Sequence, residues 1–199
     1  MTQIPIDRFN LMKRFTYHLL VTLAALVLFT CCTRFNGNRQ DSNVPASPSP
    51  QSVERLPKGT SFVSDYANVI DDASQARLES LLTKLKAKSN IEFSVVTIDT
   101  TKGEPIGDYS LAVAREWGIG PKNPADGGGL LLMLAINDRQ WRLQVSRSLE
   151  KDLPNDVCQT LAEPSMQFYK TGNYGGGIEN YAAALIDRLE KARQFSMEQ

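Results

Sequence analysis

The sequence predicts a protein of the α/β class, with a mixed β-sheet that carries helices on both faces. Helical stripes and short strand-like runs alternate along the chain, so that helices precede, separate and follow the strands. The run Leu130–Ile136 is apolar throughout, which is typical of a central strand covered on both faces. Trp141, Leu143 and Val145 then alternate with polar residues after a short turn, which predicts a hairpin partner for that strand.

The elements before this hairpin follow from local patterns. Asp71 or Asp72 is placed to cap a helix whose lysines gather near its end. The β-branched run Glu92–Ile98 lies between turn residues and predicts a strand. Two stripes of apolar residues at helical spacing predict the flanking helices, the second of which ends at Gly118: Leu78, Leu81, Leu82 and Leu85, then Ile106, Tyr109, Val113 and Trp117.

The C-terminal part of the chain is predicted to be helical. The stretch Asn155–Tyr169 is expected to be helical. The glycines Gly175–Gly177 are expected to form a tight turn that leads into a long closing helix. The apolar stripe of that last helix consists of Ile178, Tyr181, Ala182, Leu185, Ile186 and Leu189.

The N-terminal segment, residues 1–32, has the pattern of a secretory signal. The basic pair Lys13 and Arg14 precedes a short apolar run that ends at Cys31 and Cys32. The sequence before Cys31 resembles a bacterial lipoprotein box, so we expect an extracytoplasmic protein of the periplasm or cell envelope that is lipidated at its N-terminus. Ordinary secretion and an uncleaved signal anchor remain as alternatives, and the choice between Cys31 and Cys32 stays open.

A Pro-, Ser- and Asn-rich linker is predicted over residues 33–58, because this stretch is too polar to bury a core. It joins the signal segment to one domain, residues 59–199, which has the size of a single folding unit. The domain contains one cysteine, Cys158, on a predicted helix. We expect this thiol to be buried and structural.

Charge and histidine content exclude several functions. The 199 residues include 22 basic and 22 acidic ones, so there is no basic excess of the kind that nucleic-acid binding requires. The single histidine, His18, lies in the signal segment, so the domain lacks the residue on which Ser-His, Cys-His and His-zinc mechanisms depend. The reactive groups that remain are mainly carboxylates and hydroxyls.

Several segments form a recognisable set when they are taken in order. These segments are Val63–Ile70, Arg115–Gly120, Asp126 with Gly128, Arg139–Val145, Leu149–Glu150, Pro164 with Phe168, and Gly172–Ile178. The ordered set resembles the TPM domain family, which includes the thylakoid acid-phosphatase-like and photosystem II repair proteins. The resemblance implies a three-layer α/β/α sandwich around a small mixed β-sheet in an extracytoplasmic domain. It also implies weak acid phosphatase activity or binding of Ca²⁺, since members of the family are reported with either property.

Four carboxylates are the candidate metal ligands: Asp65, Asp126, Glu150 and Asp156. They lie in loops beside predicted elements, and carboxylate oxygens suit Ca²⁺ or Mg²⁺. The alternative is that Asp65 and Asp126 only stabilise turns, as Asp residues commonly do. The family commonly has an acidic residue where this chain has Asn155, which weakens any site that uses that carboxylate.

The function we expect is a membrane-tethered binding or assembly factor for membrane-associated envelope proteins, with a carboxylate Ca²⁺ site. We expect the domain to be a monomer that does not bind nucleic acid. The alternative is a metal-dependent acid phosphatase-like phosphomonoesterase, in which a carboxylate-held metal activates water and Arg142 or Arg147 holds the phosphate.

Overall fold

The computed structural model describes residue 56, residue 59 and residues 61–120, 123 and 127–198. The signal segment and nearly all of the linker therefore lie outside the described residues. Residues 50–199 form one compact unit with its own hydrophobic cores, so we expect this part to fold by itself. None of the described helices has the length and apolarity needed to cross a membrane.

The sheet contains four strands in the order β1-β2-β3-β4. Strand β1 (Val63–Asp65) pairs in parallel with β2 (Ile91–Ile98), and β2 pairs in parallel with β3 (Gly128–Ala135). Strand β4 (Gln140–Val145) returns antiparallel to β3 through a hairpin turn. The mixed sheet and its hairpin are therefore confirmed.

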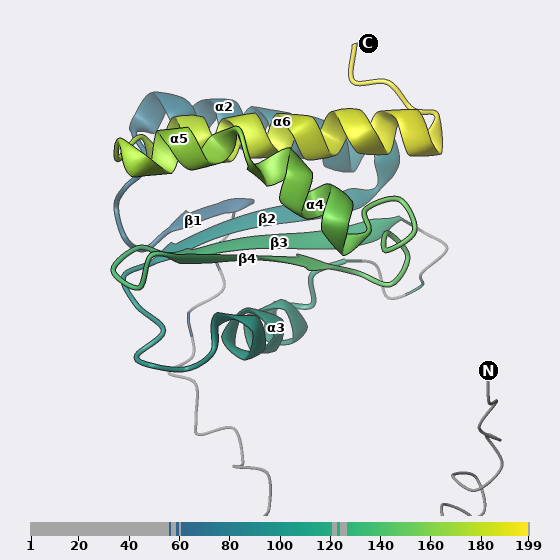
Figure 1. Cartoon of the computed structure of the whole chain (residues 1–199). Helices are drawn as coiled ribbons and strands as arrows, with labels where there is room; N and C mark the ends of the chain where they lie inside the picture. Colours follow the sequence, from purple (N-terminus) through teal and green to yellow (C-terminus); the bar gives the residue numbers. More distant parts are fainter. Residues whose placement is uncertain (1–55, 57–58, 60, 121–122, 124–126, 199) are drawn as a thin grey trace, which may run out of the picture. The chain divides into compact units, whose positions relative to one another are not determined.

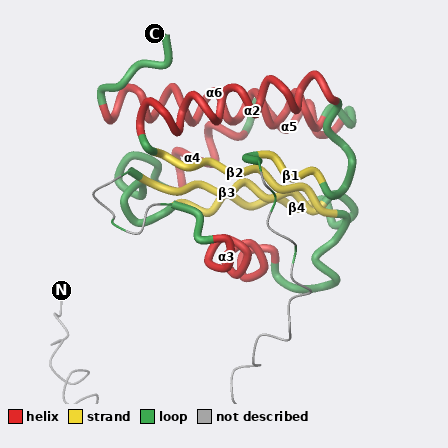
Figure 2. Tube along the Cα trace, turned by 180° about the vertical axis from the view of Figure 1, so that it is seen from behind, coloured by secondary structure: helices red, strands yellow, loops and turns green. Residues whose placement is uncertain are grey.

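Helices cover both faces of the sheet (Figure 1). On one face lie α2 (Asp72–Ser89), α4 (Asn155–Ala162), α5 (Ser165–Lys170) and α6 (Tyr174–Arg193). On the other face lies α3 (Ile106–Trp117), which the reverse view separates clearly from the rest (Figure 2). The three-layer α/β/α sandwich is confirmed.

Strand β2 divides its side chains between two cores because successive residues point to opposite faces. Phe93 and Val95 pack with the leucines of α2 and with α6, whereas Val96 and Ile98 pack with α3. Every residue of β3 is buried, as its continuous apolarity predicts. Leu56, just before β1, packs on the α3 side, and its carbonyl accepts a hydrogen bond from Trp117 Nε1 at 3.2 Å.

The two crossover connections have opposite hands. Strands β1, β2 and β3 are neighbours in order and parallel, so both connections step in the same direction across the sheet. Helices α2 and α3 nevertheless lie on opposite faces. One of the two connections is therefore left-handed, although about 98% of such crossovers are right-handed.

Local signals predicted most helix ends correctly. The Asp71 side chain caps α2 by accepting a hydrogen bond from the Ser74 N–H at 2.8 Å. Helix α3 ends at Gly118, whose φ of 65° is the left-handed conformation that favours glycine.

The structure corrects or refines three points of the sequence analysis. The stretch Asn155–Tyr169 is helical as expected, and it is divided into two helices because Pro164 has no N–H to continue the hydrogen-bond ladder between α4 and α5. The three glycines lie inside the first turn of α6, where a Cβ on Gly177 would come within 2.3 Å of Tyr169 Cε1, so close helix packing explains that glycine. Strand β1 has only three residues and no strand-like pattern of its own.

Candidate functional site

Asp65 at the end of β1 holds the turn that follows it. Its carboxylate accepts hydrogen bonds from the N–H groups of Val69 at 3.2 Å and Ile70 at 2.8 Å. It also accepts one from the Thr97 hydroxyl on β2. The turn-stabilising role of Asp65 is therefore present in the structure, and its role as a metal ligand stays a prediction.

Glu150 and Asp156 lie at the other end of the sheet from Asp65. Asp65 is in register with Thr97 on β2. Leu149, next to Glu150, lies against Gly128, since a Cβ on Gly128 would come within 2.4 Å of the Leu149 side chain. Gly128 is in register with Ile91, at the start of β2. Thr97 and Ile91 are about 20 Å apart along the extended strand β2. The structure therefore does not bring Asp65 and Glu150 together at one cation.

Asp126, the remaining candidate ligand, lies outside the described residues. Asp156 stands in the first turn of α4, where a negative charge suits the helix dipole. Among the described residues, no group of three or more His, Cys, Asp or Glu side chains is arranged to hold a metal ion.

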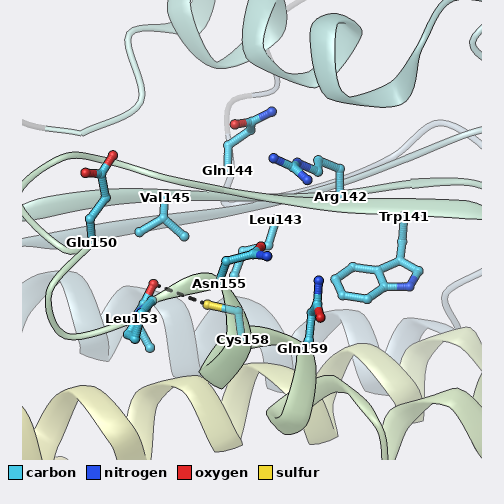
Figure 3. A pocket seen from close by; sticks show the side chains of 11 residues that line it. Trp141, Arg142, Leu143, Gln144, Val145, Glu150, Leu153, Asn155, Cys158 and Gln159 are labelled. Carbon is cyan, nitrogen blue, oxygen red and sulfur yellow. Dashed lines mark hydrogen bonds between the residues drawn. The ribbon is translucent and has the colours of Figure 1, made fainter. Parts of the chain in front are cut away.

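A groove of about 650 Å³ runs between β4 and α4, and we call it the β4–α4 groove (Figure 3). Trp141, Leu143 and Val145 face the α4 side of the sheet, and Arg142 and Gln144 point to the other side. Glu150 stands near one end of the groove. The lining from α4 and the loop before it consists of Leu153, Pro154, Asn155, Cys158 and Gln159.

A second groove of about 760 Å³ lies between the β3–β4 hairpin and α5, and we call it the hairpin–α5 groove. Tyr169 and Tyr174 stack in its wall with ring centroids 5.9 Å apart. Arg139 and Lys170 contribute cationic side chains to the same lining. The Tyr169 hydroxyl is buried with no hydrogen-bond partner among the described residues, and burial raises the pKa of Tyr169 far above its usual value.

Trp141 lines both grooves, and its ring packs on the buried Tyr181. Its ring meets the buried Tyr181 ring edge-on at 5.6 Å, and the Tyr181 hydroxyl donates to the Cys158 carbonyl at 3.0 Å. Trp117 and Tyr181, which the sequence places on apolar helical stripes, are buried in the core. Trp141 is only half-buried. The sequence signal for this partial exposure is the alternation of apolar and polar residues along its strand.

The comparison with known families decides the identity of the domain. The chain matches the family model described as the TPM domain over residues 63–188, which is more than half of its length. The chain belongs to the TPM domain family. This match confirms the resemblance seen in the sequence.

One curated relative matches part of this TPM domain in sequence. The UPF0603 protein YdjH of Bacillus subtilis (strain 168) is 26% identical over 119 residues, which are 60% of this chain and 44% of YdjH. The chain thus matches less than half the length of that relative.

Two solution NMR structures resemble the domain. The N-terminal domain of a P. gingivalis protein has a TM-score of 0.61 at 28% identity, with 68% of this chain and 86% of that chain covered. The N-terminal domain of a Corynebacterium glutamicum protein has a TM-score of 0.52 at 18% identity, with coverages of 73% and 87%, and supports the fold alone.

In this TPM domain, Asp138 fixes the hairpin turn next to Arg139. Its carboxylate accepts hydrogen bonds from the Thr101 N–H and the Thr100 hydroxyl, both at 2.8 Å. These hydrogen bonds hold the pKa of Asp138 below its usual value, and the bond from the Thr101 N–H has the largest effect. The lowered pKa means that the ionised form stabilises the fold above the unfolded value of 3.8, and that this contribution is lost as the pH falls through the lower folded pKa.

We therefore expect Asp138→Asn to lower the melting temperature at pH 7 and to flatten its decline below about pH 4. Thermal unfolding followed by circular dichroism between pH 2 and pH 7 measures both effects. A constant difference between the two proteins across this range would contradict the argument, because protonation should make their side chains equivalent at low pH.

Cys158 of the TPM domain is a buried free thiol, as the sequence predicts. Burial, together with the nearby charge of Asp156, raises its pKa, so less reactive thiolate is present at neutral pH. In a protein of residues 50–199, where Cys158 is the one cysteine, we expect iodoacetamide at pH 8 to react roughly 100-fold more slowly before than after addition of urea. Equal rates, measured by mass spectrometry, would mean that the thiol is accessible in the folded state.

Proposed function

We propose that this TPM domain is a binding module that holds or assembles proteins at the cell envelope. The observation that carries the proposal is the hairpin–α5 groove, where stacked aromatic rings and two cationic side chains line one cavity. The groove lies at the carboxyl end of the parallel strands, where open α/β sheets usually bind their ligands. Aromatic and arginine side chains are also the residues enriched at protein interfaces.

The chemistry of the grooves favours binding over catalysis. Cys158 is the one thiol in the lining of the β4–α4 groove, and its raised pKa opposes nucleophilic attack. The single histidine of the chain, His18, lies outside the described residues. The alternative of a metal-dependent phosphomonoesterase has no specific observation in its favour within the described part of the chain.

The proposal includes a tether. The signal segment ends in Cys31 and Cys32, and the linker of residues 33–58 is long and polar enough to separate an anchor from the domain. A lipid at either cysteine would keep the domain at the outer side of the membrane, near membrane-associated partners. Replacing both cysteines by serine should move the protein from the membrane fraction to the soluble fraction and abolish palmitate labelling.

Site-specific photo-crosslinking in cells tests the binding function. We expect the full chain with a photoreactive residue at Tyr174 or Gln140 to form discrete crosslinked products in the membrane fraction. The same residue at exposed Lys84 on α2 serves as the control and should not form them. Lys170→Glu should weaken crosslinking from Tyr174, and identical products from all three positions would contradict a groove-specific partner.

The cation site remains part of the proposal in a narrower form. Glu150 and Asp156 are exposed carboxylates near the same end of the sheet, and Asp126 stays a candidate third ligand. A Ca²⁺ titration of the full chain, followed by calorimetry, should show saturable binding that Glu150→Gln and Asp156→Asn weaken. The absence of saturable binding at millimolar Ca²⁺ would refute the site, and Mg²⁺ competition would measure its selectivity.

A further inference from the structure

We propose that the outer edge of β4 binds an extended segment of the partner polypeptide as an additional strand of the sheet. This inference rests on the proposed binding function and specifies how the partner is held. The relevant surface is the β4–α4 groove, which follows the strand from Trp141 to Val145.

The backbone pairing shows which groups of β4 are available. The Ser146 N–H donates to the Gly129 carbonyl at 2.9 Å, and Ser146 stands opposite Gly129 when the β3–β4 register is extended by one residue. Because antiparallel pairs alternate, Arg142 and Gln144 direct their backbone groups toward β3. The N–H and C=O groups of Trp141, Leu143 and Val145 therefore point away from the sheet, and no described residue pairs with them.

This edge lacks the features that usually prevent strand addition. Natural edge strands are commonly very short or carry proline, bulges or several charges. The opposite edge of this sheet, β1, follows that rule with three residues. Strand β4 has six residues in unbroken register with β3, no proline, and a single charged residue, Arg142.

The side chains beside the edge specify the segment. A strand added to β4 would place alternate residues next to the apolar side chains of Trp141, Leu143 and Val145 on the α4 side. The residues between them would lie beside Arg142 and Gln144 on the other face. Arg142 is exposed and has no ion-pair partner among the described residues, so an acidic side chain is the complementary neighbour.

The partner segment therefore alternates apolar residues with polar ones and carries an acidic residue opposite Arg142. Main-chain hydrogen bonds to β4 supply a large part of the affinity, and the groove toward α4 selects the apolar side chains. The test uses a protein of residues 50–199, the unit that holds both cores, and a blocked heptapeptide, Thr-Val-Asp-Val-Thr-Val-Lys, as the probe.

Amide hydrogen exchange measured by NMR reads the proposed pairing directly. With saturating peptide, we expect slower exchange at the outward amides of Trp141, Leu143 and Val145. The inward amides of Arg142 and Gln144 should change little, because β3 already protects them. No slowing at millimolar peptide, or slowing confined to other elements, would overturn the proposal.

Two matched pairs of variants separate edge pairing from other binding. Val145→Pro removes an outward N–H, whereas Val145→Ala removes side-chain contacts but keeps that N–H, so the proline variant should bind the peptide at least about 3-fold more weakly. Arg142→Glu should weaken binding roughly 5-fold, and Lys84→Glu, with the same charge change on α2, should have no effect. Equal affinities within both pairs would refute strand addition at β4.

The remaining outcomes distinguish this inference from the function on which it rests. If the free protein sediments as a dimer with its outward β4 amides already protected, the occupant is a second copy and the partner-segment proposal is wrong. If Arg142→Glu leaves the crosslinks at Tyr174 unchanged and the peptide does not bind, the β4 edge fails while the binding function stands. If the chain without further substitutions forms no groove-specific crosslinks, both the binding function and the β4 inference are refuted.

Discussion

Replacing Gly127 by alanine is expected to destabilise the domain by about 3 kcal/mol or more. Gly127 has a φ of 131°, in the region where side chains other than glycine are strained. A Cβ at this position would also lie 2.2 Å from the Asn90 carbonyl oxygen, where α2 ends. Because the obstacle is backbone, neither β3 nor the end of α2 can move aside without disturbing the ladder between β2 and β3.

Gly103 provides the matched control for this experiment. It also has a positive φ, 90°, but a Cβ there would meet nothing within 4 Å. Gly103→Ala should therefore cost only the backbone strain, about 1–2 kcal/mol. Urea unfolding of the two variants measures the difference, and equal losses would show that the crowding at Asn90 has no energetic effect.

Asp65→Ala is expected to destabilise the domain by about 2–4 kcal/mol. The substitution leaves the N–H groups of Val69 and Ile70 and the Thr97 hydroxyl without their acceptor, and each unsatisfied donor in a partly buried place carries a penalty of about 1–3 kcal/mol. Asp65→Asn keeps one acceptor oxygen and should cost less. Chemical unfolding at pH 7 in the presence of a chelator measures these losses without any contribution from metal.

Asp99 is a suitable control because it stands directly after the end of β2, as Asp65 stands at the end of β1. Its side chain is exposed and has no partner among the described residues, so Asp99→Ala should change the free energy of unfolding by less than about 0.5 kcal/mol. Repeating the measurements with Ca²⁺ separates the two roles of Asp65. If the loss caused by Asp65→Ala were present only with Ca²⁺, the carboxylate would be a metal ligand and not a structural acceptor.

The sheet and most helices could be predicted because their residues carry strong local signals. The stripe that ends at Gly118 and the apolar run Leu130–Ile136 each match a single kind of element. Strand β1 carries no such signal, since three residues cannot show a period and their pairing with β2 is a long-range contact. The break at Pro164 was readable from the residue type, although the prediction gave only a helical stretch from Asn155 to Tyr169.

The candidate site was less predictable because it depends on which ends of the elements meet. A sequence shows that Asp65 and Glu150 are loop residues, but it does not show that the register of β1 and β2 sets them at opposite ends of the sheet. The grooves are equally non-local, since the stacked pair Tyr169 and Tyr174 joins two helices on either side of a turn. Only the alternation along β4, which separates the side chains of its two faces, was present in the sequence pattern, and its place at the edge of the sheet was not.

In the proposed tethered form, the contact between Leu56 and Trp117 would set the side on which the linker joins the domain. Leu56 is held on the α3 face, whereas α4 and α5, which border the two grooves, lie on the opposite face of the sheet. A linker that continues from Leu56 toward the membrane would pull on the α3 side. Under that arrangement both grooves would lie on the side of the sheet away from the linker, and a partner could reach them without contacting the anchor chain.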